Sequence, residues 1–155
     1  MRILIDDMAA RVTPVFEHAG DPMGTHGDFV RWLLEVAWTQ GETETLGDEL
    51  PGLTFHHGGV ERQTDGDDLA AIIHRWLEGF PDLRFEVADL LEQEDRVAVR
   101  ARLSGTHHGT WRGLSATGKR IEYDVAMFFR WEDDRLVEVW EIDDTARRDR
   151  QLGIR

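Results

Sequence analysis

The sequence predicts an α+β domain in which helices cover one side of a curved antiparallel sheet. The apolar period changes along the chain: up to Phe80 apolar residues recur mainly at helical spacing, whereas from Leu83 to Asp143 they alternate with polar residues as in strands. Short turns such as Asp133-Asp134 divide the second part into a meander. Such a layout leaves a pocket between the sheet and the helices.

The first predicted helix runs from Asp28 to Gln40, or roughly four turns. Gly41 supplies its stop, because glycine tolerates the left-handed backbone that often ends a helix. A short second helix is predicted over residues 42–50 before Pro51, and a short strand over residues 53–57. The apolar residues of the first helix at helical spacing are Phe29, Trp32, Leu33, Val36 and Ala37.

The third predicted helix begins at Thr64 or Asp65 and ends before Pro81. Asp67 and Asp68 lie in its first turn, where the helix dipole favours negative charge. One apolar stripe follows its length, which predicts a helix packed on a sheet. The stripe consists of Leu69, Ile72, Ile73, Trp76, Leu77 and Phe80.

Four strands are predicted after this helix, and the last of them carries the most informative pattern. Its two faces differ in chemistry because side chains alternate along a strand. One face has Val137, Val139, Glu141 and Asp143, and the other has Leu136, Glu138, Trp140 and Ile142. The second face would leave an apolar patch on the outside of the sheet, which predicts a homodimer through that face.

Four segments resemble the SnoaL-like polyketide cyclase and ester cyclase group of the NTF2-like superfamily. They read E-V-A-W-T-Q-G, F-P-D-L-R-F-E-V, G-T-H-H-G-T-W-R-G-L-S-A-T-G-K-R-I and V-E-V-W-E-I-D-D. The resemblance implies an NTF2-like cone-shaped barrel, a curved antiparallel sheet with three helices enclosing a pocket. It places this domain over residues 28–155 and leaves residues 1–27 as an N-terminal extension with glycines and a proline near its end.

Composition excludes several classes of function. The net charge of −13 disfavours nucleic acid and anionic membranes as partners, because both bind cationic surfaces. Without cysteine the chain has no disulfide, catalytic thiolate or thiolate metal site. No stretch approaches the roughly 20 apolar residues of a membrane span, and no signal peptide is recognisable, so a cytoplasmic location is expected. Histidine spacing typical of a metal-binding helix is missing, and we expect neither metal nor cofactor.

Glu141 and Asp143 are the leading candidates for catalysis. They share a strand face with valines, and a carboxyl group in apolar surroundings has a raised pKa that suits a general acid or base. The resemblance implies the same role for Glu141, because the acid/base carboxylate of the cyclases directly follows the tryptophan of this strand. The cyclases have Asp there and His two residues earlier, where this chain has Val139. Alternatively, the two carboxylates pair with arginines of neighbouring strands, namely Arg100, Arg102 or Arg130.

Histidines and aromatic residues complete the predicted site. His107 and His108 end a long strand, where alternation turns one of them inward to hold a carbonyl or shuttle a proton. His56-His57 shows the same ambiguity on the first strand. Each has a structural alternative, as a loop histidine or as part of the core. The expected substrate-binding residues are Tyr123, His56, Trp32, Trp76 and Phe129.

These residues predict a cofactor-independent cyclase or isomerase that acts on a small apolar or polycyclic carbonyl compound. Glu141 or Asp143 would remove a proton next to the carbonyl, and His107, His108 or Tyr123 would stabilise the enolate. Two alternatives stay open: a non-catalytic protein that binds a small hydrophobic ligand, and an epoxide hydrolase. The latter would need a water-activating Asp-Arg-Asp set, for which Asp124, Arg102 and Asp143 have the right types.

Overall fold

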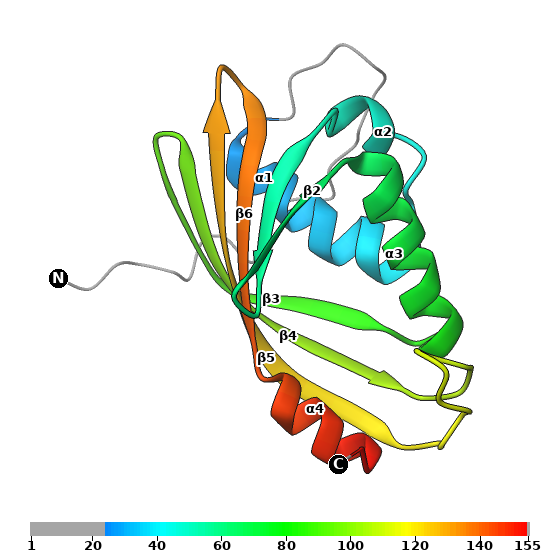
Figure 1. Cartoon of the computed structure of the whole chain (residues 1–155). Coiled ribbons are helices and arrows are strands. Elements are labelled where there is room, and N and C mark those ends of the chain that lie inside the picture. Colours follow the sequence, from blue (N-terminus) through cyan, green and yellow to red (C-terminus); the bar gives the residue numbers. More distant parts are fainter. Residues whose placement is uncertain (1–23, 155) are drawn as a thin grey trace, which may run out of the picture.

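The computed structural model describes residues 24–154, so the predicted extension lies outside the described residues except for 24–27. Figure 1 shows the helices between residues 26 and 79 gathered on the concave side of one strongly curved sheet, with the C-terminal helix apart from them. The elements, in chain order, are α1 (His26–Trp32), the π-helix η1 (Leu33–Trp38), α2 (Leu46–Glu49), β1 (Leu53–His57), β2 (Val60–Thr64), α3 (Gly66–Gly79), β3 (Arg84–Gln93), β4 (Arg96–Thr106), β5 (Arg120–Glu132), β6 (Arg135–Asp143) and α4 (Thr145–Leu152).

The six strands follow the order β2-β1-β6-β5-β4-β3. The predicted α+β class and curved sheet are confirmed, with three differences. The pairing of β1 with β6 is parallel, so the sheet is mixed, and it stays open at its two ends. The hairpin partner β2 was not predicted, because its sequence V-E-R-Q-T is almost entirely polar. Helix α4 was also not predicted, and it packs on β5.

Capping side chains decide where the two long helices begin. The Thr25 hydroxyl accepts the Asp28 N–H at 3.1 Å, and the Asp28 carboxylate accepts the Thr25 N–H in return, so α1 begins at His26 rather than at Asp28. Asp65, one of the two predicted starts, caps α3 by accepting the Asp68 N–H at 2.9 Å.

The first helix, which consists of α1 continued by η1, is also bound to the free edge of β3. Glu35 accepts the Val87 N–H at 3.1 Å, and Thr39 accepts the Phe85 N–H at the same distance. An exposed edge strand offers unpaired N–H groups to other chains, and these two side chains cover part of that edge.

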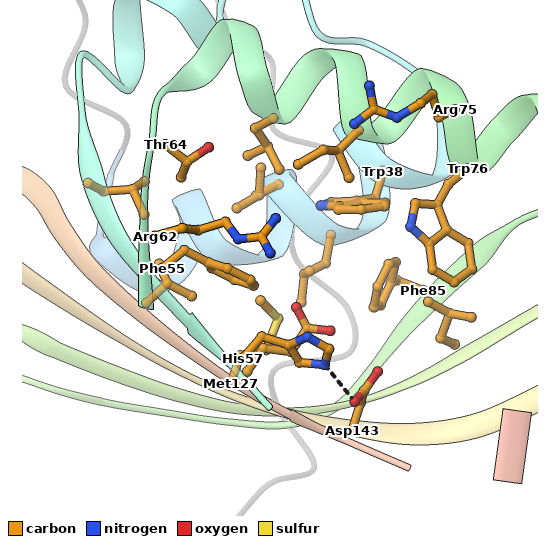
Figure 2. Close-up of a pocket in the computed structure, with 18 of the residues that line it drawn as sticks. Trp38, Phe55, His57, Arg62, Thr64, Arg75, Trp76, Phe85, Met127 and Asp143 are labelled. Atoms are coloured by element: carbon orange, nitrogen blue, oxygen red, sulfur yellow. Dashed lines mark hydrogen bonds and ion pairs between the residues drawn. The ribbon is translucent and has the colours of Figure 1, made fainter. Parts of the chain in front are cut away.

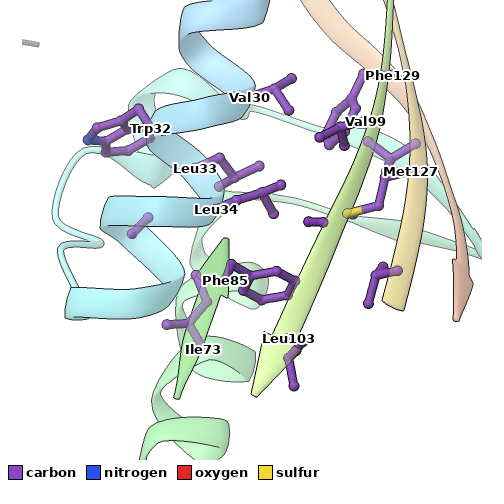
Figure 3. Close-up of a cluster of buried hydrophobic side chains, with 14 of the residues drawn as sticks. Val30, Trp32, Leu33, Leu34, Ile73, Phe85, Val99, Leu103, Met127 and Phe129 are labelled. Atoms are coloured by element: carbon purple, nitrogen blue, oxygen red, sulfur yellow. The ribbon is translucent and has the colours of Figure 1, made fainter. Parts of the chain in front are cut away.

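The core lies between this helix layer and the concave face of the sheet (Figure 3). Val30 and Leu34 project from the first helix, Ile73 from α3, and Phe129 from β5; all four are fully buried or nearly so. Burial of large apolar side chains from all these elements holds the helices on the sheet.

A bulge in β6 changes the predicted face of one residue. Arg130 of β5 pairs with Glu138, but the next residue, Trp131, pairs with Leu136, which leaves Val137 as an extra residue. Leu136 is therefore buried on the same side as Val139, and its predicted outward position is wrong. Beyond the bulge the predicted alternation holds.

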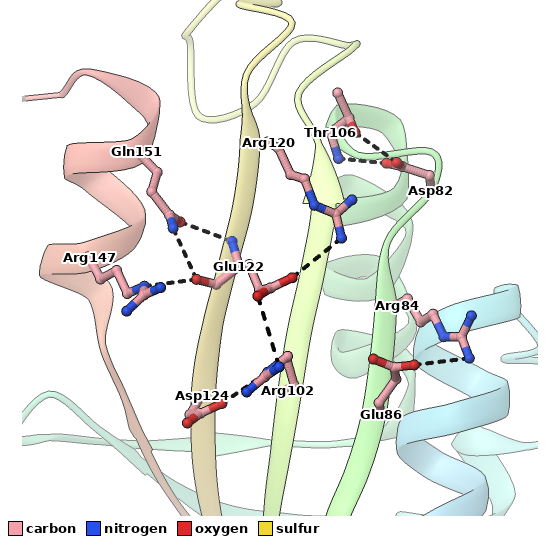
Figure 4. A network of polar contacts seen from close by, with 10 residues as sticks. All are labelled: Asp82, Arg84, Glu86, Arg102, Thr106, Arg120, Glu122, Asp124, Arg147 and Gln151. Carbon is pink, nitrogen blue, oxygen red and sulfur yellow. Dashed lines mark hydrogen bonds and ion pairs between the residues drawn. The ribbon is translucent and has the colours of Figure 1, made fainter.

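The outer face of the sheet carries exposed ion pairs (Figure 4). Arg102 lies 3.4 Å from Asp124, and Arg120 lies 3.5 Å from Glu122. Such exposed pairs contribute little stability each, about 0–1 kcal/mol. Helix α4 packs beside β5, where the Gln151 side chain bonds to the backbone of Glu122.

Apolar side chains also reach this outer face. Phe128 is 47% exposed, Ile142 64% and Leu91 66%. The homodimer predicted through this face stays a prediction. In the part of the chain that the structure describes, no helix has the length and apolar character needed to cross a membrane.

We expect Gly66→Ala to destabilise the protein by roughly 1–3 kcal/mol. A Cβ atom at Gly66 would lie 1.8 Å from the Leu46 carbonyl oxygen, so α2 and α3 would have to separate. Urea unfolding measures the change. Gly52→Ala is the control, because its Cβ would meet nothing within 4 Å. Equal stability of the two variants would contradict the close α2–α3 approach.

Candidate functional site

A pocket of about 520 Å³ opens between the concave sheet face and the helices. Its volume suits a small organic ligand, since such sites span roughly 300–1,000 Å³. Figure 2 shows aromatic side chains from both layers around it, including Trp38, Phe55, Trp76 and Phe85. Most of the wall is apolar. Its polar side chains include the carboxylates of β6 and several arginines.

The carboxylates of the pocket wall that lie nearest to the sheet come from the end of β6. Glu141 and Asp143 both line the pocket, as the alternation beyond the bulge requires. Neither forms an ion pair with Arg100, Arg102 or Arg130, which pair instead with Asp89, Asp124 and Glu138. The alternative of cross-strand ion pairs is therefore wrong for these two carboxylates.

His57 joins them from the neighbouring strand. Its Cα is the parallel partner of Glu141, and its Nε2 lies 2.9 Å from Asp143 Oδ1 (Figure 2). Since a carboxylate can only accept, the histidine donates this bond. The Asp143 side chain is 6% exposed and that of His57 39%, so the bond joins a buried carboxylate to an imidazole that is partly open to solvent. Sequence alternation alone left His56 and His57 equivalent, and the structure turns His57 inward.

Glu141 has the most strongly perturbed carboxyl group of the site. Burial, together with the charge of Asp143, raises its pKa from the ordinary value of 4.5 to about 7, against a smaller opposing effect of His57 and Arg148. Within residues 24–154, the Glu141 carboxyl has no hydrogen-bond partner. It can therefore take up or release a proton near neutral pH.

Tyr123 and Arg148 lie at the same end of the pocket. Burial raises the pKa of Tyr123, so its hydroxyl stays protonated and can donate a hydrogen bond. Arg148 contacts that hydroxyl and stacks its guanidinium 5.2 Å from the centre of the Trp111 ring. Arg148 was missed from the sequence, because its position depends on how the unpredicted helix α4 packs.

The other expected substrate-binding residues divide into two groups. Trp76 and Phe129 line the pocket with Tyr123, whereas Trp32 is buried in the core and does not line it. His56 points to the other face of the sheet, where it lies 2.8 Å from Glu138 and stacks on Trp140. The predicted pocket positions of Trp32 and His56 are wrong.

His107 and His108 do not reach the carboxylates. His107 turns inward as alternation predicted, but it is fully buried beside Phe80, and its Nδ1 bonds to the Thr117 hydroxyl at 3.0 Å. His108 is exposed. Neither lines the pocket, so the geometry fits the structural alternative, in which His107 holds the hairpin loop.

The epoxide hydrolase set is not assembled. Arg102 and Asp124 pair on the outer face of the sheet, where each is about half exposed, whereas Asp143 lies in the pocket on the other face. This alternative is wrong for these residues.

A metal ion is the remaining question for this cluster. One ligand atom each from His57, Glu141 and Asp143 lies within 4.8 Å of the others, a spacing that suits a divalent cation. However, His57 Nε2 already bonds to Asp143, and the Arg148 guanidinium contributes positive charge close by. These contacts fit a proton-transfer site better than a metal centre.

The raised pKa of Glu141 predicts how stability changes with pH. Between about pH 4.5 and 7 the unfolded chain has lost this proton while the folded protein keeps it, so the contribution of Glu141 to stability falls as the pH rises. We expect Glu141→Gln to remove this decline. Urea unfolding across that range measures it, with exposed Glu44→Gln as the control. If the free energy of unfolding changed with pH in the same way for the parent and for Glu141→Gln, the raised pKa of Glu141 would be contradicted.

Comparisons with known proteins give the family. The model of the SnoaL-like polyketide cyclase family matches residues 28–152. No curated protein matches the chain. Among solved structures, IdmH, a candidate polyketide cyclase from Streptomyces antibioticus, is 28% identical, with a TM-score of 0.67 over 82% of this chain and 97% of that one. AclR, a candidate hydroxylase from Streptomyces galilaeus, is 26% identical, with a TM-score of 0.64 over 76% and 87%.

A SnoaL-like protein from Jannaschia sp. CCS1 shares the fold, with a TM-score of 0.72 at 21% identity over 88% of this chain and 98% of that one. The matched range contains every strand that the structure describes, together with Glu141 and Asp143. The chain therefore belongs to the SnoaL-like polyketide cyclase family.

Proposed function

We propose that the protein is a cofactor-independent cyclase or isomerase that acts on a small apolar or polycyclic carbonyl compound by general acid/base catalysis. One observation carries the proposal: Glu141 lies in an apolar pocket with no hydrogen-bond partner among the described residues and with a pKa near 7. A base acts best when its pKa lies near the working pH.

The two carboxylates have different surroundings, which suggests different roles. Asp143 accepts a hydrogen bond from His57, whereas Glu141 is left free to face a ligand. The negative charge of Asp143 also raises the pKa of Glu141. Asp143, held by His57, therefore tunes the pKa of the base, and Glu141 transfers the proton.

His57 also accounts for the departure of this chain from the cyclase pattern. The related cyclases have a histidine two residues before their catalytic carboxylate, where this chain has Val139. Here β1 supplies a histidine instead, because its parallel pairing with β6 sets His57 beside Glu141. An imidazole is thus present near the base from a different strand.

The reaction would begin with transfer of a proton from the carbon next to the carbonyl to Glu141. Negative charge would move to the carbonyl oxygen, where the protonated Tyr123 hydroxyl can donate a hydrogen bond. The carbanion then either attacks a second carbonyl group and closes a ring, with the new alkoxide oxygen taking the proton back from Glu141, or takes that proton back at another carbon. The first outcome is cyclisation and the second is isomerisation.

A non-catalytic binding protein is the second candidate, because the same apolar pocket would serve it. It predicts no turnover by the parent protein and ligand affinity that is nearly independent of Glu141.

We expect Glu141→Gln to lower turnover by roughly 10²- to 10⁴-fold while binding persists, because glutamine keeps the shape but cannot cycle a proton. Exchange of α-protons for deuterium in polycyclic ketones and β-keto esters, followed by NMR, measures the proton transfer without knowledge of the product.

Asp143→Asn distinguishes the role of Asp143 from that of Glu141. We expect it to retain more activity than Glu141→Gln and to move the rise of activity to lower pH, because loss of the Asp143 charge lowers the pKa of Glu141. Full activity in Glu141→Gln with loss in Asp143→Asn would assign the chemistry to Asp143 instead.

Removal of metal ions should leave activity unchanged, since the proposed proton transfer uses side chains alone. Dialysis against EDTA followed by the same exchange assay tests this. Activity lost on dialysis and restored by Zn²⁺ or Mn²⁺ would show that His57, Glu141 and Asp143 act as metal ligands.

A further inference from the structure

The net charge of the residues that line the pocket is opposite in sign to the net charge of the whole chain. Its lining contains the four arginines Arg62, Arg75, Arg112 and Arg148 and only three acidic residues, Glu78, Glu141 and Asp143. The net formal charge of the lining is thus 4 − 3 = +1, and protonation of Glu141 near pH 7 makes it more positive. The whole chain has a charge of −13.

Three of these arginines are unpaired. In the described part of the chain, Arg62, Arg75 and Arg112 have no ion-pair partner, whereas arginines on the outer sheet face such as Arg100 and Arg102 each have one. Glu78 also lines the pocket, but among the described residues it forms no ion pair with any of these three arginines. Unpaired guanidinium groups beside an apolar cavity are suited to an anionic ligand group.

Strand register turns Arg62 toward the pocket. In the β1–β2 hairpin Arg62 pairs with Phe55, so both side chains lie on the inner face. The neighbouring pair, His56 and Glu61, lies on the outer face, where the two side chains approach to 3.8 Å. The acidic neighbour of Arg62 is thus bound on the opposite side of the sheet. Thr64 follows Arg62 on the inner face and adds a hydroxyl.

Arg75 reaches the pocket from the helix layer. It lies on α3 one turn after Ile72, which also lines the pocket. Figure 2 shows the Arg62 and Arg75 side chains on the helix side of the cavity, while His57 and Asp143 lie next to the sheet. The guanidinium groups of Arg62 and Arg75 therefore lie apart from the His57–Asp143 pair, whereas Arg148 lies at the Tyr123 end of the cavity.

We propose that the natural ligand is an aromatic or polycyclic carboxylate, whose carboxylate group is held by Arg62 and Arg75. This proposal deepens the proposed function and rests on it for the position of the reacting carbon. Guanidinium groups bind a carboxylate through paired N–H donors, and the negative charge of Asp143 would repel the same group. Both effects turn the apolar ring system, with its acidic carbon, toward Glu141.

Binding of matched probes tests the proposal. Isothermal titration calorimetry compares 6-hydroxy-2-naphthoate with its neutral methyl ester, on the parent and on the double variant Arg62→Gln, Arg75→Gln. We expect the parent to bind the carboxylate roughly tenfold more tightly than the ester. The double variant should lose this preference while its affinity for the ester stays nearly unchanged. Added salt should weaken binding of the carboxylate alone, because both arginines are exposed.

Arg135→Gln is the matched control. Arg135 is an exposed arginine in β6 without an ion-pair partner among the described residues, and it does not line the pocket. We expect it to keep the preference for the carboxylate. Equal affinity of the parent for both probes, no binding of either at millimolar concentration, or the same loss in Arg135→Gln as in the double variant would overturn the proposal.

The two proposals fail in different ways. Full proton exchange by Glu141→Gln with an intact preference for the carboxylate would overturn the catalytic role and keep the charge-based recognition. Loss of proton exchange in Glu141→Gln, together with equal binding of the carboxylate and the ester by the parent, would keep the catalytic role and overturn the charge-based recognition.

Discussion

The parallel pairing of β1 with β6 is the contact on which both the fold and the site depend. It runs from Thr54 opposite Glu138 to His57 opposite Glu141 and joins the β1–β2 hairpin to the meander. Through it the hairpin becomes a wall of the pocket and brings Arg62 to the cavity. The same pairing sets an imidazole beside two carboxylates. Short strands that pair over so few residues need support, which the β1–β2 ladder and the core beneath Leu53 provide.

Most of the fold could be predicted from the sequence, because its long elements have a strong period. The stripe of α3 and the alternation of β4 and β5 fix each element and its buried face. Weakly patterned elements escaped prediction. In β2 the side chains are polar on both faces, and its hairpin depends on the positive φ angles of Gly58 and Gly59. The bulge at Val137 leaves no trace in the alternation, so the reversed face of Leu136 could be seen only in the sheet register.

Site residues could be predicted where their position depends on alternation along one strand. They could not be predicted where it depends on how several elements pack together. Glu141, Asp143 and Tyr123 follow from alternation along β5 and β6. Alternation also separates His56 from His57, but which of them faces inward depends on how β1 docks on β6. His107 shows the limit of the same argument: its inward side chain meets Phe80 and Thr117 rather than the cavity. Arg148 required knowledge of how a helix returns to the sheet.

The first helix serves two surfaces at once, and this limits how the pocket can be enlarged in evolution or by engineering. Leu33, Leu34 and Trp38 form part of the pocket wall, while Glu35 and Thr39 bind the free N–H groups of β3. Moving the helix outward would make room for a bulkier compound but would also uncover a strand edge that can pair with other chains. Changes of ligand size are therefore compatible with solubility only when they replace wall side chains and leave the helix in place.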